Sequence, residues 1–515
     1  MSSRLTLPRR SVCSALRRWL VVPLLALLAF SAGTAPAAAA PPSLREQARA
    51  GLARATDYLR SISTEGGYLW RYSPDLQRRL GEKVATQTQI WVQPPGTPTI
   101  GQVFLRAYAI THERRYLTAA RAAALALVRG QLRSGGWDYL VELAPGKRSA
   151  WAYRSEPAPT RSDAKDVSTY DDDNTQSALR FLLAFVDVAK AAPDRRDASI
   201  RASLDYGLRR LLEAQYPNGG WPQRWSGAAH DPATYPVLKA SYPAEYPREQ
   251  PSGDYTGHYT LNDDTQADVI RTLLDAHRRT AKAEYLSAAK RGGDFLLLAQ
   301  MPEPQPVWAQ QYDAAMHPTW ARAFEPPSVT SNESAEVVQL LLDLYLATGD
   351  DRYLAPLPAA LGWFKRSALS PQPYPQLWSR LYELKTNVPI YGDRDKRIHY
   401  QLEEISEERR TKYAWQRPFG IPAMIERAEG ILRAGREKWL AQLQAAPDGP
   451  AQKAARVAEL EPRVRELLSA LDERGRWVTP ASDRKFQGLE GPWIEMATFA
   501  AHLQTLCDYL AVAPR

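Results

Sequence analysis

Apolar residues recur at helical spacing in four units along the chain. In the unit that opens at Asp173 the pattern is carried by Ala178, Phe181, Leu182, Phe185 and Val186. The other units open at Pro98, Asp263 and Asn332, so the openings lie 75, 90 and 69 residues apart. In each unit a second helix follows and leads to a loop that carries a tryptophan: Trp137, Trp221, Trp308 and Trp378. The pattern predicts four tandem helix pairs separated by long loops.

The polar residues at the openings predict how these helices are oriented. Asp, Asn and Thr are good N-cap residues, and Gly-Gly before Trp137 and Trp221 is a good helix stop. All the first helices should then point the same way. Helices that each hide one face can close into a toroid, with first helices inside and second helices outside. We therefore expect an all-α fold, an (α/α) toroid of about four tandem pairs with long functional loops.

That toroid would gather acidic and amide side chains at one mouth: Asp173, Asn174, Asp263, Asp264 and Glu333. Oxygen ligands from two separate helix starts suit calcium, although no EF-hand loop is present. The same residues can equally serve as helix caps and nothing more.

The remaining segments predict the division of the chain. Residues 1–40 have arginines before an apolar stretch and end in Ala38-Ala39-Ala40, which is typical of a signal peptide. Residues 41–97 form an N-terminal helical and loop extension, 98–423 the toroid, and 424–515 a C-terminal helical hairpin and closing helices. Residues 226–259, rich in Pro, Tyr and Gly, form a long loop of the kind that often serves function. We expect a protein that is secreted or periplasmic and has no membrane anchor after signal removal.

Charge and cysteine content narrow the possibilities further. The formal charge of +9 falls to +4 once the five arginines of residues 1–40 are removed, which is not typical of a nucleic-acid-binding protein. Cys13 is lost with the signal, so Cys507 has no intramolecular disulfide partner. We expect a monomer stabilised by packing.

Arginines are concentrated in two loop-rich stretches near aromatic residues. Arg322 precedes Pro326-Pro327, and a later stretch holds Arg394, Arg397, Arg409, Arg410 and Trp415. Such arginines are often simply paired with neighbouring acids. In loops they can also bind carboxylates bidentately. A partner that needs both cations and a carboxylate-held metal is itself a polyanion, and an acidic polysaccharide fits, with Trp and Tyr faces for the sugar rings.

Four motifs resemble polysaccharide lyase family 10, the pectic acid lyases: GGWPQRW, YTLNDDTQ, VWAQQYDAAMHPTWARAFEPPS and IYGDRDKRIHYQLEEISEERRTKYAW. The resemblance runs in order from about Ala85 to Trp415. The resemblance implies an (α/α) toroid that cleaves polygalacturonate by calcium-assisted β-elimination. It also implies calcium carboxylates at Asp173 and Asp263, with Asp264 as the neighbouring candidate, and Asn174 beside the bound sugar.

The resemblance further implies that Arg322 is the catalytic base and that Arg394 and Arg409 or Arg410 hold substrate carboxylates, with Trp221 and Trp415 as further contacts. Thr175 stands where the family often has Gly, and WAQQYD stands where it often has Cys and His. An arginine base requires a lowered pKa, because the ordinary value lies above about 12. Tyr312, Lys239 and Lys412 are alternative bases if Arg322 only binds a carboxylate.

Two other classes of protein remain open. A glycoside hydrolase could use Asp173, Asp263 and Glu325 as paired acid and base. A catalytically inactive uronan-binding protein would keep the same cations. A terpene-cyclase-like toroid is disfavoured, because such pockets are apolar whereas this mouth is rich in acids and arginines.

Overall fold

The computed structural model describes residues 42–369, 376–444, 449–480 and 490–514. Ser43–Arg515 form one compact unit. The predicted signal peptide, residues 1–40, lies outside the described residues, so its cleavage stays a prediction. Among the described helices none is both long and apolar enough to cross a membrane.

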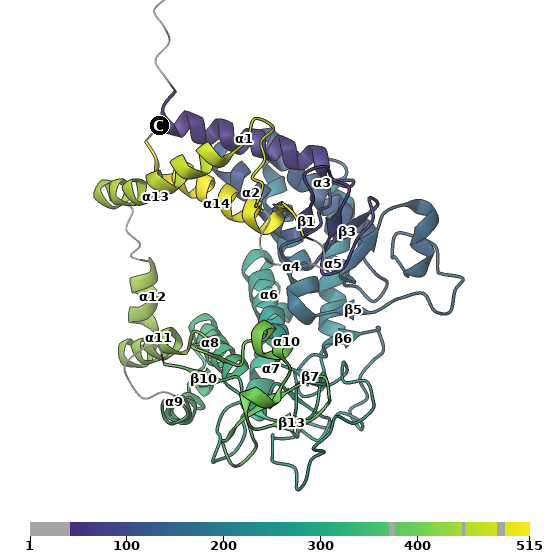
Figure 1. The fold of residues 1–515 in the computed structure, drawn as a ribbon, viewed down its shortest axis with the longest axis vertical. Helices are drawn as coiled ribbons and strands as arrows, with labels where there is room; N and C mark the ends of the chain where they lie inside the picture. Colours follow the sequence, from purple (N-terminus) through teal and green to yellow (C-terminus); the bar gives the residue numbers. More distant parts are fainter. Residues whose placement is uncertain (1–41, 370–375, 445–448, 481–489, 515) are drawn as a thin grey trace, which may run out of the picture. The chain divides into compact units, whose positions relative to one another are not determined.

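The fold is all-α, with the helices arranged in antiparallel pairs (Figure 1). The four predicted first helices are α2 (Thr97–Thr111), α4 (Asn174–Val188), α6 (Thr265–Thr280) and α8 (Ser331–Thr348). Their partners are α3 (Arg114–Gly130), α5 (Asp197–Glu213), α7 (Ala283–Ala299) and α9 (Leu357–Arg366), the last preceded by the 3-10 turn η5 (Asp351–Leu354). The other helices are α1 (Leu44–Ile62), α10 (Glu407–Lys412), α11 (Ile421–Ala434), α12 (Arg436–Gln444), α13 (Pro450–Ala470) and α14 (Met496–Val512).

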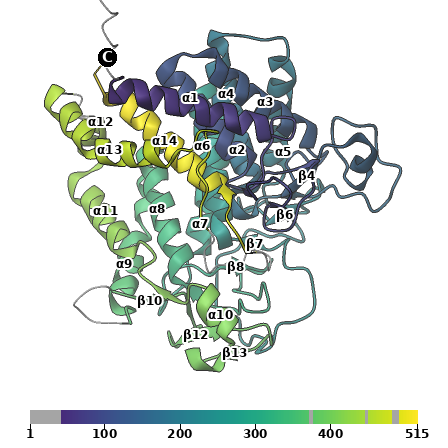
Figure 2. The same cartoon turned by 45° about the horizontal axis from the view of Figure 1, so that its top comes forward.

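The inner helices form a curved row in which each packs against the next: α14, α2, α4, α6, α8 and α11 (Figures 1 and 2). This confirms the predicted (α/α) toroid class and extends the row beyond the four predicted pairs at both ends. α14 joins α2 to α1 and α13, and α11 follows α8. One predicted helix after residue 424 is in fact two, since α11 stops at Gly435, whose φ of +74° ends the helix and lets α12 begin.

The repeated tryptophans join each outer helix to the loop that follows it. Each indole Nε1–H donates to a carbonyl near the C-terminal end of the preceding helix at 2.8–2.9 Å: Trp137 to Leu127, Trp221 to Leu211, Trp308 to Leu296, Trp378 to Phe364, and Trp477 to Leu467. The last four carbonyls of a helix lack internal partners, so each such bond satisfies one of them and stabilises the fold by about 1 kcal/mol. The tryptophan repeat is therefore a structural device of the core.

Short antiparallel strands fix the loops at the starts of the inner helices. β5 (Ser168–Thr169) pairs with β6 (Arg224–Trp225), β7 (Tyr259–Thr260) with β8 (Gln311–Tyr312), and β9 (Val329–Thr330) with β11 (Leu381–Tyr382). β5, β7 and β9 directly precede the openings of α4, α6 and α8. The strands thus clamp the chain where each inner helix begins.

The other strands tie remaining loops together. β1 (Arg71–Tyr72) pairs with β2 (Arg79–Leu80) and β15 (Ile494–Glu495), β3 (Gln89–Trp91) with β4 (Leu140–Glu142), and β10 (Trp378–Ser379) with β14 (Gln416–Arg417). β12 (Pro389–Gly392) pairs with β11 and with β13 (Ile398–His399). The β1–β15 pair brings residues from the two ends of the unit together.

Candidate active site

The starts of α4 and α6 carry tight turns with an unusual backbone. The 3-10 turns η2 (Asp171–Asp173) and η4 (Asn262–Asp264) contact each other. In each, two successive residues have positive φ: 51° and 57° at Asp172 and Asp173, and 49° and 58° at Asp263 and Asp264. Asp tolerates this left-handed region better than most residues, which explains the acidic runs at these positions. The turns aim their side chains across the gap between the two helix starts.

Three carboxylates meet there. Asp171, Asp172 and Asp263 each offer an oxygen, and these oxygens all lie within 4.8 Å of one another. The Tyr139 hydroxyl donates to Asp171 Oδ2 at 2.9 Å and to Asp172 Oδ2 at 3.4 Å. We call Asp171, Asp172 and Asp263 the acidic cluster.

Burial and mutual repulsion perturb the acidic cluster. Burial, followed by the charges of Asp171 and Asp263, raises the pKa of Asp172 to about 7. Burial, opposed by Arg322 and reinforced by Asp171, raises the pKa of Asp263 to about 6. Like charges held this close need a cation to be stable together in their ionised forms.

The donor set fits a hard divalent cation. The Asp171 Oδ1, Asp173 Oδ1 and Asn174 Oδ1 atoms are buried without a hydrogen-bond donor, so oxygen lone pairs beside the cluster are unused. Carboxylate and amide oxygens with no nitrogen or sulfur ligand suit calcium. Asp171, Asp172 and Asp263 would hold the ion.

The predicted metal ligands are divided by the structure. Asp263 lies in the cluster. Asp173 forms an ion pair through Oδ2 with Arg180 on the following helix α4, and its Oδ1 has no hydrogen-bond donor. Asp264 lines a separate cavity of about 170 Å³ with Asn332 and Glu336. Asp171 and Asp172, which the sequence analysis did not single out, are the residues that lie with Asp263 in the cluster.

Arg322 links the cluster to a buried acid. Its Nη2 donates to Asp263 Oδ2 at 2.9 Å, and its Nε donates to Glu325 Oε2 at 2.7 Å. Glu325 is fully buried and also accepts from the Tyr413 hydroxyl at 3.1 Å. Burial by itself lowers the pKa of the Arg322 guanidinium, but the charges of Glu325 and Asp263 outweigh it and raise the pKa above its ordinary value. In this arrangement Arg322 is a cation.

Two further predicted arginines lie beside Arg322. The guanidinium carbons of Arg394 and Arg409 lie 5.9 and 4.3 Å from the centre of the Phe324 ring, and that of Arg322 lies 5.5 Å from it. Arg394 and Arg409 both donate to Glu408, at 3.1 and 2.7 Å. Phe324 thus gathers three cations that the sequence places far apart.

Arg410 does not join this group. It is exposed on α10, whereas its neighbour Arg409 is buried. Adjacent helical residues point about 100° apart, so only one member of the pair can face Phe324. Arg409 is therefore the member of the pair that lies over Phe324.

Three predicted substrate contacts are buried instead. Trp221 is 0% exposed, with its indole bound to Leu211, so it belongs to the core and we no longer assign it to the substrate. Trp415 is 2% exposed and donates to the Arg409 carbonyl at 3.1 Å, so it supports α10 from beneath. Asn174 is 0% exposed and donates to the Trp137 carbonyl at 2.9 Å. Of the alternative bases, Tyr312 is buried and donates to Ala299 O, which removes it from the site.

Sequence reasoning also missed Arg380. Its Nη2 donates to Glu333 Oε1 at 2.6 Å, its guanidinium lies 4.9 Å from the Tyr413 ring centre, and its Nε is buried without an acceptor. The signal was present, because Arg380 lies two residues after Trp378 in the fourth repeat. It went unused because a single arginine in a loop between Ser379 and Leu381 forms no recurring pattern.

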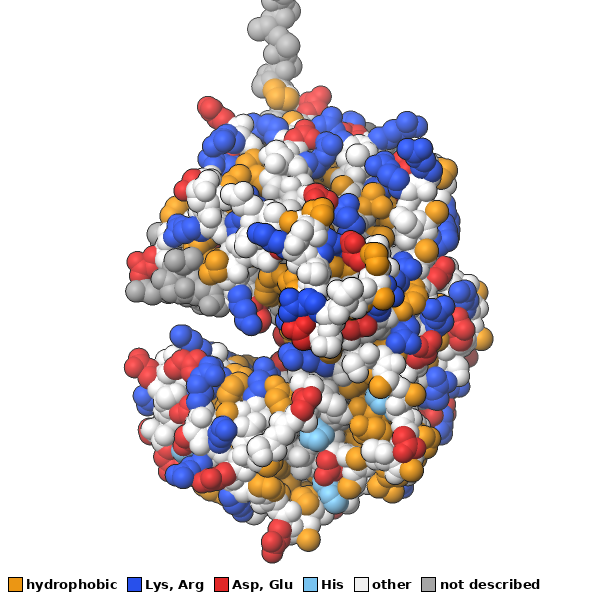
Figure 3. All heavy atoms as spheres, turned by 90° about the vertical axis from the view of Figure 1, so that its right-hand side faces the viewer, with side chains coloured by type: hydrophobic (Ala, Val, Ile, Leu, Met, Phe, Trp, Pro, Cys, Tyr) orange, Lys and Arg blue, Asp and Glu red, His pale blue; other side chains and the backbone are white. Residues whose placement is uncertain are grey.

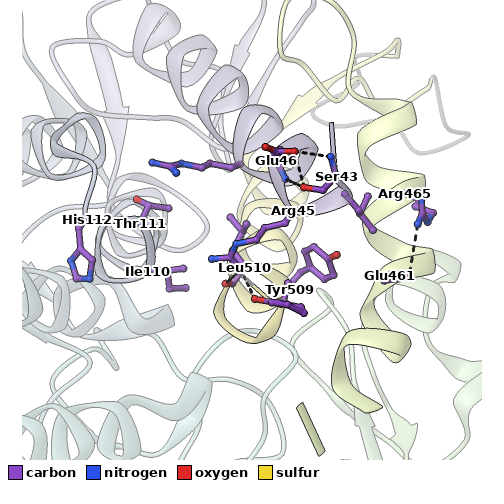
Figure 4. Close-up of a pocket in the computed structure, with 14 residues that line it drawn as sticks. Ser43, Arg45, Glu46, Ile110, Thr111, His112, Glu461, Arg465, Tyr509 and Leu510 are labelled. Atoms are coloured by element: carbon purple, nitrogen blue, oxygen red, sulfur yellow. Dashed lines mark hydrogen bonds and ion pairs between the residues drawn. The ribbon is translucent and has the colours of Figure 1, made fainter. Parts of the chain in front are cut away.

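A larger cavity lies away from these residues. It measures about 840 Å³ and is bordered by the start of α1 and the ends of α2 and α14 (Figure 4). There Arg45 donates to the carbonyls of Leu510 and Ala513 at 2.8 and 2.6 Å, which caps the C-terminal end of α14. None of the predicted site residues borders it.

The surface carries both signs of charge. On the face drawn in Figure 3, Lys and Arg side chains alternate with Asp and Glu. An intermixed surface of this kind is not the continuous basic stripe that binds nucleic-acid backbones.

Comparison with known protein families decides the assignment. A sequence model of the family described as pectic acid lyase matches residues 144–374 and 365–422, which together exceed half of the chain. The chain belongs to the pectic acid lyase family. It is a polysaccharide lyase, as the resemblance of its motifs predicted. The matched segment contains the acidic cluster, Arg322, Arg394 and Arg409.

Several solved structures resemble this member of the pectic acid lyase family, at low sequence identity. A mutant of the family 10 polysaccharide lyase from Cellvibrio cellulosa, in complex with trigalaturonic acid, is 23% identical with a TM-score of 0.45, covering 65% of this chain and 98% of its own. The GH76 α-mannanase from Bacteroides thetaiotaomicron is 11% identical with a TM-score of 0.40, covering 91% and 96%. No curated protein matches the chain.

Proposed function

We propose that the protein is an exported pectate lyase that cleaves polygalacturonate by calcium-dependent β-elimination, with Arg322 as the base. The observation that carries the proposal is the acidic cluster joined to Arg322 through Asp263, three carboxylate oxygens within 4.8 Å and a 2.9 Å ion pair. Family membership supplies the reaction class. The residues supply the binding of a uronate and its cation.

The chemistry requires neutralisation of a substrate carboxylate. In β-elimination the C5 proton of a uronate leaves before or with the C4 oxygen, and negative charge develops on the adjacent carboxylate. A calcium ion held by the acidic cluster would stabilise that charge as a Lewis acid. Arg394 and Arg409, which lie around Phe324 with Arg322, are further cations whose bonds to Glu408 can be exchanged for bonds to the substrate.

Arg322 needs a change in its surroundings to act as a base. Its Nη2 now neutralises Asp263, and its Nε neutralises Glu325. When the Asp263 carboxylate binds a cation, it stabilises the protonated form of Arg322 less. The positive charges of the neighbouring Arg394 and Arg409 also disfavour protonated Arg322. We therefore expect turnover to rise toward alkaline pH.

One observation favours a second assignment of the base. Arg394 is 64% exposed and pairs with the partly exposed Glu408, whereas Arg322 pairs with a fully buried acid and with the cluster. Arg394 is thus freer to approach a C5 proton, and Arg322 would then bind the substrate carboxylate. The two assignments predict different variants to be inactive.

The first experiment follows ultraviolet absorbance of the unsaturated product from polygalacturonate at alkaline pH, with and without chelator. We expect a calcium-dependent rise that the chelator abolishes. Reducing ends without absorbance would mean hydrolysis and would contradict the lyase proposal. Neither signal, with polymer still bound, would mean an inactive uronan-binding protein.

The base is tested with Arg322→Ala, Arg394→Ala and the control Arg352→Ala, which lies on η5 and pairs with Asp350. Arg322→Ala should abolish turnover and leave oligogalacturonate binding within about tenfold, since a base acts on the transition state rather than on binding. Retention of more than a few per cent of wild-type activity would exclude Arg322. Loss of turnover with intact binding in Arg394→Ala alone would assign the proton transfer to Arg394.

Export is tested separately. Expression of the full chain in a bacterial host, followed by N-terminal sequencing of the periplasmic and culture fractions, should find a mature end near Ala40. An intact chain confined to the cytoplasm would contradict the signal-peptide prediction.

A further inference from the structure

The strand pair β5–β6 carries an unassigned arginine, Arg224, next to the turn that holds Asp171 and Asp172; the two strands are labelled in Figure 1. Arg224 on β6 is the register partner of Thr169 on β5, two residues before Asp171. The Tyr170 N–H donates to Gln223 O at 2.9 Å, and the Arg224 N–H donates to Thr256 O at 3.1 Å. The backbone of Arg224 is thus held from both sides.

The register also fixes the side on which Arg224 projects. Paired residues of antiparallel strands point to the same face, so Arg224 lies on the face of Thr169. Thr169 ends β5 two residues before Asp171, and the Tyr139 phenol donates to Asp171 and Asp172. Trp225, next along β6, faces the opposite way and is buried. Arg224 therefore projects on the face of the acidic cluster.

Tyr255 lies near both Arg224 and the proposed catalytic residues. It is half-buried, and its phenol is within electrostatic reach of Arg322 and Glu325 as well as of Arg224. Tyr255 belongs to the loop 226–259, for which the sequence predicted a functional role. The ring offers a platform between two cations that a chain of linked sugars could follow.

Arg224 differs from the other site arginines in having no fixed partner. Arg322, Arg380, Arg394 and Arg409 each donate to a carboxylate. Arg224 is exposed, and among the described residues no carboxylate forms an ion pair with it. Asp254 is the acid that faces it, but Asp254 Oδ1 accepts from Thr256 N and Oγ1 at 2.9 and 2.7 Å. An unpaired guanidinium can bind an incoming carboxylate without breaking an existing bond.

We propose that Arg224 is a further substrate-binding residue that takes the carboxylate of a uronate unit next to the one bound at the acidic cluster. The inference rests on the proposed uronan lyase activity. A planar guanidinium matches a carboxylate bidentately, and a polyuronate presents such a group on every unit. Arg224 then sets preference for an unesterified unit at this position, because a methyl ester has no charge to pair.

The test compares Arg224→Ala, Arg224→Lys and the control Arg201→Ala, an exposed arginine on the outer helix α5. With polygalacturonate, Arg224→Ala should raise KM about tenfold, as expected for one charge-assisted contact, while kcat falls less than about threefold. Arg224→Lys keeps the charge but loses the bidentate geometry, so its KM should lie between that of wild type and that of Arg224→Ala. The dependence of KM on ionic strength should weaken in Arg224→Ala, because one screened attraction is lost.

Methyl-esterified pectin gives an independent readout. The ratio of kcat/KM for polygalacturonate over that for highly esterified pectin should fall in Arg224→Ala and stay unchanged in Arg201→Ala. If Arg224→Ala matches Arg201→Ala in KM and in this ratio while wild type cleaves polygalacturonate, the assignment of Arg224 is overturned and the proposed function stands. If wild type neither cleaves nor binds the polymer in affinity electrophoresis, both are overturned.

Discussion

The turns before α4 and α6 have the same backbone conformation, but their side chains make different contacts. Each has two successive left-handed residues followed by the helix. In both, the first left-handed residue, Asp172 or Asp263, enters the acidic cluster. The second, Asp173 or Asp264, is the N-cap residue and turns away, to Arg180 in one case and to a separate cavity in the other.

The two turns differ most at the residue that precedes the two left-handed residues. Asp171 adds a third carboxylate to the cluster, whereas Asn262 at the same place donates to Asp263 at 2.7 Å and accepts from Gln310 at 2.6 Å. The first turn therefore supplies charge, and the second supplies one carboxylate that is oriented by an amide and paired with Arg322. A repeated backbone motif fixes direction, and its individual residues decide the chemistry.

The largest effect should follow the loss of the shared carboxylate. Asp263→Asn removes one negative charge from the cluster and the carboxylate partner of Arg322, so we expect kcat/KM on polygalacturonate to fall about a thousandfold at fixed calcium. Asp264→Asn, one residue on, should keep more than about a tenth of wild-type activity. Ultraviolet assays of both variants measure this, and equal losses would break the distinction between the two positions.

A second pair of variants compares the same positions in the other turn. Asp172→Asn should weaken the apparent calcium affinity by about 10- to 100-fold, since it removes a cluster oxygen. Asp173→Asn should change it less than about fivefold and instead lower the free energy of unfolding by about 1–3 kcal/mol, because the partly buried Arg180 keeps only the longer 3.6 Å ion pair with Asp268. Calcium titration of initial rates and urea denaturation report the two effects. The reverse pattern would restore Asp173 as the ligand expected from the sequence.

The smallest effect concerns pH and Asp264. Burial, followed by the charges of Glu336 and Asp268, raises the pKa of Asp264 to about 7, against an unfolded value of about 3.9. The folded protein binds this proton more tightly, so the stability it contributes is complete below about pH 4 and is lost as pH rises to about 7. Asp264→Asn should therefore reduce the loss of stability between acidic and alkaline pH.

Urea denaturation of the chelator-treated protein at pH 5 and pH 8 measures that difference. The exposed Asp205→Asn on α5 is the control and should follow wild type. If Asp264→Asn showed the same pH dependence as wild type, the cavity beside Glu336 would not hold a strained acid.

Much of the fold could be predicted because it depends on local patterns. Helical periodicity located α2, α4, α6 and α8 to within a few residues, and the Trp loops marked the ends of their partners. The extra members of the row, α11 and α14, were harder to place in it. Their neighbours α2 and α8 are defined by packing between distant segments, which periodicity does not record.

The candidate site likewise has features that the sequence predicts and features that depend on the tertiary structure. The sequence by itself determined the acidic turns, the loop arginines and the reaction class, because these depend on residue type and motif order. Only the tertiary structure decided which carboxylates converge, that Arg409 rather than Arg410 faces Phe324, and that Trp221 is core. A step of one residue along a left-handed turn or a helix points the side chain in a different direction, about 100° away in a helix. Direction therefore comes from backbone geometry and packing, which neighbouring identical letters such as Asp172 and Asp173 do not distinguish.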